Sequence, residues 1–474
     1  MRELTEDKPL KLIFLFTIPL LIGNIFQQFY SMADMIIVGQ TLGKNALAAV
    51  GATGSIIFLI IGFAQGLTSG LSIITAQRFG ARDYRGVKKS FAASIFISFV
   101  VTVILTIISL LFIRPLLLVM QTPAEIMADA QTFISIILIG IFSAMAFNLL
   151  SNVIRALGDS RTPLIFLVVA SVVNVVLDLV LIINFNMGVA GAGVATVIAQ
   201  MVASLLCLIY IQKRIPNLQV RKKDFSFEKK EIREHLNAAL PMAFQTSIIA
   251  IGAIVLQGAI NSLGTDVVAA QAAAGKIDQF AIQPMMSFGI TMATFTAQNY
   301  GAKKYGRILE GAKSALLLSL GFSLAAGAIV ILFGRQLVTL FVSAGETEVI
   351  RLSQIYFNIN GSLYWVLAIL LIVRYTLQGL GKSVIPTIAG IMELVMRSFA
   401  AIVLTASFGF IGAVSAAPLA WIGSTVVLIY SFTGAVKKLK HLETHEEQRT
   451  LSLENRYIEV GTNTHEGCRP HQTE

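Results

Sequence analysis

The stretch SVVNVVLDLVLI at 171–182 decides how this chain folds. It is apolar and, with its neighbours, long enough to lie in a membrane, yet it contains Asn174 and Asp178. These residues are four positions apart, so on a helix their side chains lie one above the other on a single face. A carboxylate at the bilayer centre costs about 2.5–3.5 kcal/mol on insertion scales, and such a residue usually faces a bundle interior or a water-filled cavity. Asp178 is therefore a candidate functional residue.

The composition is that of a polytopic membrane protein. Of the 474 residues, 55% are hydrophobic and only 13% are charged, whereas about 25% are charged in soluble domains. The formal net charge of +10 does not indicate nucleic-acid binding, because the basic residues fall in short connectors between apolar runs. In that position they set the orientation of a membrane protein.

Apolar runs of membrane-spanning length recur along the whole chain. They lie at roughly 12–38, 46–75, 88–113, 131–155, 162–184, 190–212, 236–260, 267–297, 308–333, 354–377, 385–406 and 411–436. Lipid allows only helices or closed barrels, and these continuous runs are not alternating strands. The sequence therefore predicts an all-α fold with about twelve transmembrane helices.

Basic residues concentrate in the connectors after the even-numbered runs, above all in the segment 213–235. The positive-inside rule then places both termini in the cytoplasm, with the protein integral to the plasma (inner) membrane. The segment 213–235 is interpreted as a cytoplasmic linker. The tail, 437–474, is polar and mixed in charge, and we expect it to be a disordered cytoplasmic extension.

The chain also repeats itself. TAQRFGARDYRG at 75–86 matches TAQNYGAKKYGR at 296–307, and GVAGA at 188–192 matches GFIGA at 409–413, in both cases 221 residues on. An even number of helices separates the copies, so the two halves share one orientation. We expect two pseudo-symmetric six-helix lobes, 1–212 and 236–436, around a central cavity.

Asp34 is a second acid inside an apolar run. It follows Tyr30 by four residues and Gln27 by seven, which collects these side chains into one polar stripe on a helix. Such a stripe can line a cavity. The alternative is hydrogen bonding between helices, which explains amide side chains but does not require a carboxylate.

Further polar groups occur in the same half of the chain. Asn148 and Asn152 repeat the four-residue spacing, and Thr196 adds a hydroxyl on the sixth run. Carboxylates, carboxamide oxygens and hydroxyls are hard ligands that suit Na⁺, and carboxylates in apolar surroundings can also carry protons. The first lobe thus contains the parts of a cation or proton site, although Asn152 and Thr196 could equally be packing groups.

The second lobe differs in its chemistry. The positions 221 residues after Asp34 and Asp178 carry no acid. Asp278 could help to bind a cationic substrate, while Glu393 and Arg397, four residues apart, most simply form an ion pair within one helix. No Walker A, HExxH, CxxC or GxSxG pattern is present, so we expect neither an enzyme nor an ATP-driven pump, and no cofactor.

Taken in order, four segments resemble the multidrug and toxic compound extrusion (MATE) family. They are QQFYSMADMIIVG at 27–39, RALGDSRTP at 155–163, NVVLDLVLI at 174–182 and GVAGAGVATVIAQ at 188–200, and the resemblance covers about residues 8–436. It implies secondary active efflux of drugs and organic cations, driven by Na⁺ or H⁺ through alternating access.

The resemblance also implies roles for single residues. It places the coupling site, with Na⁺ as one possible occupant, on Asp34, Asn174, Asp178 and Thr196, and the cavity wall on Gln27, Tyr30, Asn148 and Asn152. The chain departs from the family pattern in two places. The segment PMAFQTSIIA at 241–250 lacks the acid of some members, and Leu179 stands where many have proline.

We therefore expect a monomeric antiporter, surrounded by lipid, for small molecules that are often cationic or amphipathic. A flippase for lipid-linked sugars is one alternative, but it needs several cationic residues in its cavity, and only Lys276, Arg374 and Arg397 are candidates. A channel or receptor-like membrane protein is another, because it could use polar stripes without a coupling acid.

Overall fold

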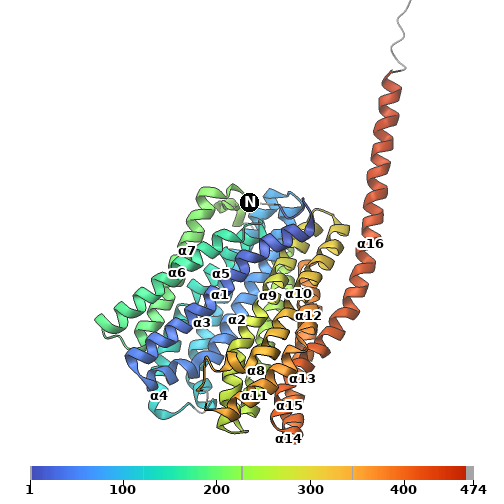
Figure 1. Ribbon diagram of the computed structural model, residues 1–474. Coiled ribbons are helices and arrows are strands. Elements are labelled where there is room, and N and C mark those ends of the chain that lie inside the picture. The colour runs from blue at the N-terminus through green and yellow to red at the C-terminus, as the bar shows by residue number, and fades with distance from the viewer. Residues whose placement is uncertain (1–2, 121, 226–227, 344, 466–474) are drawn as a thin grey trace, which may run out of the picture.

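The computed structural model describes residues 3–120, 122–225, 228–343 and 345–465, and the side chains of 119 and 450–465 fall outside this description. Within these ranges the chain is helical and contains no strand (Figure 1). The first half consists of α1 (Pro9–Leu42), α2 (Lys44–Gly80), α3 (Tyr84–Val119), α4 (Ala124–Ile139), α5 (Ile141–Ala156), α6 (Arg161–Leu179), η1 (Val180–Asn184) and α7 (Val189–Arg214).

Two short turns, η2 (Pro216–Leu218) and η3 (Lys222–Phe225), lie in the linker. The second half then repeats the pattern of the first. It consists of α8 (Lys229–Asn261), α9 (Thr265–Gly301), α10 (Tyr305–Val338), α11 (Thr347–Gly361), α12 (Tyr364–Gly379), α13 (Val384–Phe399), η4 (Ala400–Leu404), α14 (Thr405–Phe408), α15 (Phe410–Val414) and α16 (Ala416–His465).

The helices group into twelve long segments. Among the described residues, nine helices are long and apolar enough to cross a membrane, or eleven when the bent pairs α4/α5 and α11/α12, with bends of 45° and 47°, each count as one span. The remaining segment is α9, which has 37 residues but also Lys276, Asp278 and several amide side chains. Its polar positions explain why composition alone does not identify it as a span.

The internal repeat is visible in the backbone. Residues with left-handed backbone conformation recur 221 positions apart, and so do the sharp connections that they form between helices. The pairs are Gly43 with Gly264, Arg82 with Lys303, and Gly188 with Gly409. The π-helical segments η1 and η4 likewise occupy equivalent places, after α6 and α13. Each lobe therefore folds to the same six-segment plan.

The two lobes meet backbone to backbone at the end of the bundle where α2 and α9 finish, here called the closed end. Gly70 of α2 lies directly against the backbone of Ala239 in α8, and Gly80 lies against the backbone of Gln298 in α9. A side chain at either glycine would overlap the opposite helix. Toward the other end of the bundle, Gly51 has no neighbouring atom within 4 Å of where a Cβ would lie. The backbone contact that α2 makes at Gly70 and Gly80 is therefore not repeated at Gly51.

Symmetry-related hydrogen bonds cross between the lobes at the closed end. Gln77 Nε2 in the first lobe donates to the carbonyl of Gly379 in the second at 2.9 Å. Gln298, which lies 221 residues after Gln77, donates in return to the carbonyl of Ala156 at 2.7 Å. Each glutamine thus satisfies a carbonyl group at the end of a helix in the opposite lobe.

The first residues of the chain also bridge the lobes. The amide of Leu4 donates to Gln298 Oε1 at 2.9 Å, and Asn299 Nδ2 donates to the carbonyl of Leu4 at 3.1 Å. Glu3 forms an ion pair with Arg82, in the connector between α2 and α3, at 3.2 Å. Residues 3–8, here called the N-terminal strap, therefore lie across the closed end.

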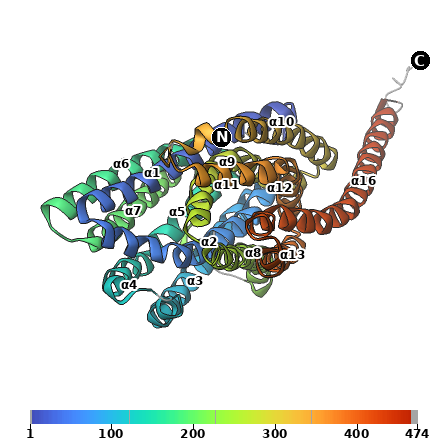
Figure 2. The same ribbon diagram turned by 60° about the horizontal axis from the view of Figure 1, so that its bottom comes forward.

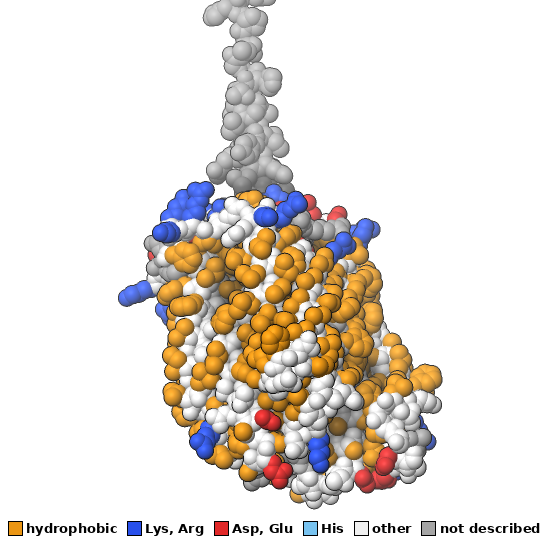
Figure 3. Space-filling view, turned by 90° about the vertical axis from the view of Figure 1, so that its left-hand side faces the viewer, with side chains coloured by type: hydrophobic (Ala, Val, Ile, Leu, Met, Phe, Trp, Pro, Cys, Tyr) orange, Lys and Arg blue, Asp and Glu red, His pale blue; other side chains and the backbone are white. Residues whose placement is uncertain are grey.

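The N-terminal strap lies at the closed end, and α16 extends well beyond the bundle there (Figures 1 and 2). Lys and Arg side chains gather at the same end, above a broad hydrophobic band (Figure 3).

The prediction of a disordered tail from 437 is wrong as far as 465, because α16 continues to that residue. Leu439 is buried against the second lobe, and Lys303 holds Glu446 at 3.2 Å. Lys440 and Glu443, three positions apart, add one pair of opposite charges along the helix. Residues 466–474 of the predicted tail lie outside the described residues.

Candidate cation site and central cavity

Three helices of the first lobe bring the four predicted coupling residues together. Asp34 comes from α1, Asn174 and Asp178 from α6, and Thr196 from α7. Asn174 and Asp178 are fully buried, and Asp34 is half-buried. The carboxyl groups of Asp34 and Asp178 are within hydrogen-bonding distance of each other. Two acids that are 144 positions apart in the sequence thus form one site.

Asn174 connects the acids to α7. With its amide oriented so that both polar atoms are satisfied, Asn174 donates to Asp178 Oδ2 at 3.0 Å and accepts from the backbone amide of Thr196 at 3.2 Å. The Thr196 hydroxyl donates to the carbonyl of Ala192 at 3.0 Å and also contacts the Tyr30 hydroxyl. Tyr30, on the same stripe of α1 as Asp34, therefore completes the cluster.

One oxygen of each acid is left without a partner. Asp34 Oδ1 and Asp178 Oδ1 are both buried, and neither has a hydrogen-bond partner among the described residues. Buried polar atoms in native proteins are nearly always paired, so two such atoms side by side need an explanation. A cation bound between the carboxylates, or a proton shared by them, would satisfy both oxygens.

The helix changes geometry directly after Asp178. α6 ends at Leu179 and continues as the π-helical segment η1, with Ile182 packed against Gly191 of α7. Single π-helical turns inside α-helices occur frequently at functional sites. Leu179 is the last α-helical residue at this point, and the local irregularity that follows it is a π-turn.

A cavity of about 530 Å³ lies between the lobes and adjoins the acid cluster. The four residues predicted for the cavity wall in the first lobe all line it, namely Gln27, Tyr30, Asn148 and Asn152. Asp34 and Asp178 do not line it. Tyr30 belongs to both the cavity wall and the acid cluster, so it joins the two.

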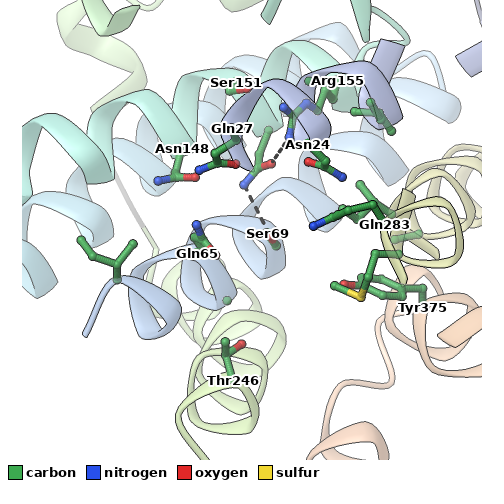
Figure 4. Close-up of a pocket in the computed structure, with 18 of the residues that line it drawn as sticks. Asn24, Gln27, Gln65, Ser69, Asn148, Ser151, Arg155, Thr246, Gln283 and Tyr375 are labelled. Atoms are coloured by element: carbon green, nitrogen blue, oxygen red, sulfur yellow. Dashed lines mark hydrogen bonds between the residues drawn. The ribbon is translucent and has the colours of Figure 1, made fainter. Parts of the chain in front are cut away.

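Figure 4 shows the polar wall of the cavity, where amide and hydroxyl groups from α1, α2 and α5 converge. Asn152 Nδ2 donates to Ser69 Oγ at 3.4 Å and to Thr68 Oγ1 at 3.2 Å, which joins α5 to α2. Asn148 Nδ2 donates to the carbonyl of Ala144 at 2.8 Å within its own helix. Asn152 therefore serves as an interhelical contact as well as a wall residue.

Asp278 lies apart from the acid cluster and from the cavity. It is held by the hydroxyl groups of Tyr356, at 3.0 Å, and Tyr364, so it sits between α9, α11 and α12. It is not one of the residues that line the cavity. The structure thus does not bring Asp278 together with the other predicted site residues.

The expected ion pair between Glu393 and Arg397 is wrong. Glu393, on α13, pairs instead with Arg374 of α12, which also donates to Ser424 Oγ at 3.1 Å. The side chain of Glu393 points across to the neighbouring helix rather than along its own, whereas Arg397 reaches the carbonyl of Ile249 at 3.4 Å. All three charged groups line the cavity.

Arg155 lines the cavity, although it was not among the residues predicted for the site. Its guanidinium group projects from the last turn of α5 into the cavity and donates to Asn152 Oδ1 at 3.4 Å (Figure 4). The signal was present in the spacing, because Asn148, Asn152 and Arg155 lie four and three positions apart on one helix face.

The arrangement, an acid pair in one of two repeated lobes beside a cavity between them, agrees with a comparison of families. The MatE family model matches residues 19–180 and 241–416. The chain belongs to the MatE family. The predicted family is therefore confirmed.

Relatives of this MatE protein cover most of its length. The probable multidrug resistance protein YpnP of Bacillus subtilis is 30% identical over 352 residues, which are 72% of this chain and 76% of YpnP. The probable multidrug resistance protein NorM of Thermotoga maritima is 24% identical over 451 residues, 94% of each chain. These relatives are transporters rather than enzymes.

Among solved structures, one that shows the outward-facing conformation of a multidrug resistance MATE family transporter has a TM-score of 0.85 and 26% identity. The match covers 93% of this chain and 98% of the other. The predicted all-α membrane fold is thus confirmed, and the chain is a multi-pass membrane transporter of a multidrug efflux family.

Proposed function

We propose that this MatE protein is a secondary antiporter that exports small drug-like molecules in exchange for Na⁺ or H⁺ by alternating access. One observation carries the proposal. Asp34 and Asp178 form a buried pair, each with one unpartnered oxygen, and Tyr30 joins this pair to the cavity. A pair of desolvated carboxylates can take up a cation or a proton, and its electrostatic energy changes strongly when it does.

The first helix links this site to the interface between the lobes. α1 carries Asp34 in its second half, while its first half contacts α9 of the other lobe. Thr17 Oγ1 and Thr291 Oγ1 are 2.8 Å apart, and Asn24 Nδ2 donates to Ser287 Oγ at 3.0 Å. An ion that repositions α1 would therefore alter contacts between the lobes. Coupling requires that the ion bind one arrangement of the lobes more tightly than the other, because a ligand shifts an equilibrium only as far as its affinities for the two states differ.

The lobes are closed at the end that carries the N-terminal strap and the basic residues. If that end faces the cytoplasm, as the positive-inside rule predicts, the cavity is available from outside, where ions would enter. A solved relative with the same fold is described as outward-facing. In the opposite arrangement the closed end would separate and admit substrate from the cytoplasm or the inner leaflet.

The test is transport in proteoliposomes with Na⁺ and proton gradients imposed separately. We expect either gradient, or one of them, to drive saturable uptake of a fluorescent substrate into inverted vesicles, and Asp34→Asn and Asp178→Asn to abolish that uptake. The matched control is Asp129→Asn, because Asp129 is an exposed acid on α4 of the same lobe. Normal gradient-driven transport by both site variants would overturn the proposal, and flux that does not saturate would indicate a channel.

A further inference from the structure

The cavity wall carries more positively charged than negatively charged side chains. Four of its lining residues are ordinarily charged, and they are Arg155, Arg374, Arg397 and Glu393. Glu393 is the only carboxylate among the described lining residues, and it is paired with Arg374 and is 4% exposed. This pair is neutral as a unit, so Arg155 and Arg397 leave the wall with an excess of positive charge.

Neither of these two arginines has a full set of partners. The Nε–H groups of Arg155 and Arg397 are buried and donate to no partner among the described residues. Each side chain makes one long hydrogen bond within the described part of the chain, 3.4 Å to Asn152 Oδ1 for Arg155 and 3.4 Å to the carbonyl of Ile249 for Arg397. Within the described part of the chain, no carboxylate oxygen lies within 4 Å of either guanidinium group.

Arg155 is the less compensated of the two. Arg397 follows Glu393 by one helical turn, so part of its charge is offset even though Glu393 is bound to Arg374. Arg155 is instead surrounded by neutral amide and hydroxyl groups, among them Asn24 and Ser151 (Figure 4). A desolvated charge without a counter-ion is costly, and a guanidinium group matches carboxylate, sulfonate and phosphate oxygens with two parallel hydrogen bonds.

We propose that the cavity selects substrates that carry an anionic group, that Arg155 binds this group, and that Arg397 adds positive potential from the opposite wall. The inference rests on the proposed export function and narrows its substrate class. Side chains such as Phe58, Phe147, Met286 and Trp421 supply apolar wall, so the ligand is an amphipathic organic anion or zwitterion. This differs from the organic cations that the family resemblance implies.

A binding experiment on the purified full-length protein in detergent tests the charge preference without any ion gradient. Two xanthene dyes of similar size are compared by fluorescence anisotropy, a carboxylated anionic dye of the fluorescein type and an esterified cationic dye of the rhodamine type. We expect the anionic dye to bind at least about tenfold more tightly, since one hydrogen-bonded charge pair is sufficient for that difference. Equal or tighter binding of the cationic dye by the wild-type protein would overturn the inference.

Matched variants then locate the preference. We expect Arg155→Gln to weaken binding of the anionic dye by about tenfold or more and to leave cationic dye binding unchanged or stronger. Arg397→Gln should weaken it less, and Arg155→Lys should retain part of the affinity. Arg161→Gln, at the exposed first residue of α6, should change neither affinity. An equal loss for both dyes would show general damage to the cavity and would contradict a role in charge selection.

The headgroup of an anionic phospholipid presents the same kind of charged group as a soluble organic anion. A second experiment therefore distinguishes a lipid substrate from a soluble one. Proteoliposomes with an acyl-labelled anionic phospholipid are treated with dithionite, which bleaches only the outer leaflet. Protein-dependent bleaching beyond half of the label, sensitive to Arg155→Gln, would identify the anion as a lipid headgroup, and its absence together with dye binding would identify a soluble substrate. Dye selectivity without gradient-driven flux would remove the proposed antiport but keep this inference. Gradient-driven flux of the cationic dye alone would support the proposed antiport and overturn this inference.

Discussion

Two ion pairs in this protein differ in their surroundings, which allows the energetics of a single residue to be tested. Arg374 and Glu393 are almost fully buried, whereas Arg351 and Glu348 form a pair at 2.6 Å on the surface. We expect Arg374→Gln to lower the free energy of unfolding by about 3–5 kcal/mol, because it leaves the Glu393 carboxylate buried without a partner. Arg351→Gln should change it far less, because water and salt screen an exposed pair.

Thermal unfolding of the detergent-purified variants measures both effects. The double variant Arg374→Gln with Glu393→Gln should recover much of the lost stability, since no unpaired charge then remains. Similar losses for Arg374→Gln and Arg351→Gln would contradict the structural role assigned to the buried pair.

The sequence predicted individual acids well and their partners poorly. Asp34 and Asp178 were identifiable because a carboxylate within an apolar run is costly wherever the helix packs. Glu393 was assigned the wrong partner, because helical spacing describes neighbours on the same helix and says nothing about Arg374 on another. Arg155 was missed because it lies three residues before the glycine of a connector, where a basic residue is ordinarily an orientation signal.

At the scale of helices, the contact of α2 with α8 at the closed end gives a sharp test. Gly70→Val places a branched side chain against the backbone of Ala239, so the closed arrangement should become less populated. A shift of about 1.4 kcal/mol changes that population ratio tenfold, and we expect substrate transport to fall accordingly.

The control is Gly51→Val, which makes the same substitution in α2 where the space is open. Transport rates are compared at equal amounts of protein in the membrane. If Gly51→Val reduces transport as much as Gly70→Val, the loss comes from replacing a glycine within α2 and not from disturbing the contact between the lobes.

Helix positions followed from the apolar runs, but helix irregularities did not. Two irregularities depend on how neighbouring helices pack, namely the bend between α4 and α5 and the π-helical segment η1. No residue pattern predicted them. The length of α16 was also underestimated, because a polar segment with suitably spaced charges resembles a disordered tail as well as an exposed helix.

At the scale of the whole molecule, the orientation in the membrane can be measured directly. With Cys207 and Cys468 replaced by serine, single cysteines are introduced at Arg85, near the closed end, and at Ser262, between α8 and α9; both positions are exposed. In intact cells we expect a membrane-impermeant maleimide to label Ser262→Cys but not Arg85→Cys. Permeabilised cells, in which both should react, serve as the control, and the opposite pattern would place the termini outside.

The contacts of the N-terminal strap limit when the closed end can form during protein synthesis. Leu4 is bonded to Gln298 and Asn299, which follow it by 294 and 295 positions. At a synthesis rate of about 5–20 residues per second, the ribosome adds these partners about 15–60 s after Leu4. Throughout that interval Leu4 lacks both of these partners, even though it is among the first residues to leave the ribosome. These contacts between the lobes can therefore form only after α9 has been made, and a nascent chain that stalls before the end of α9 lacks them.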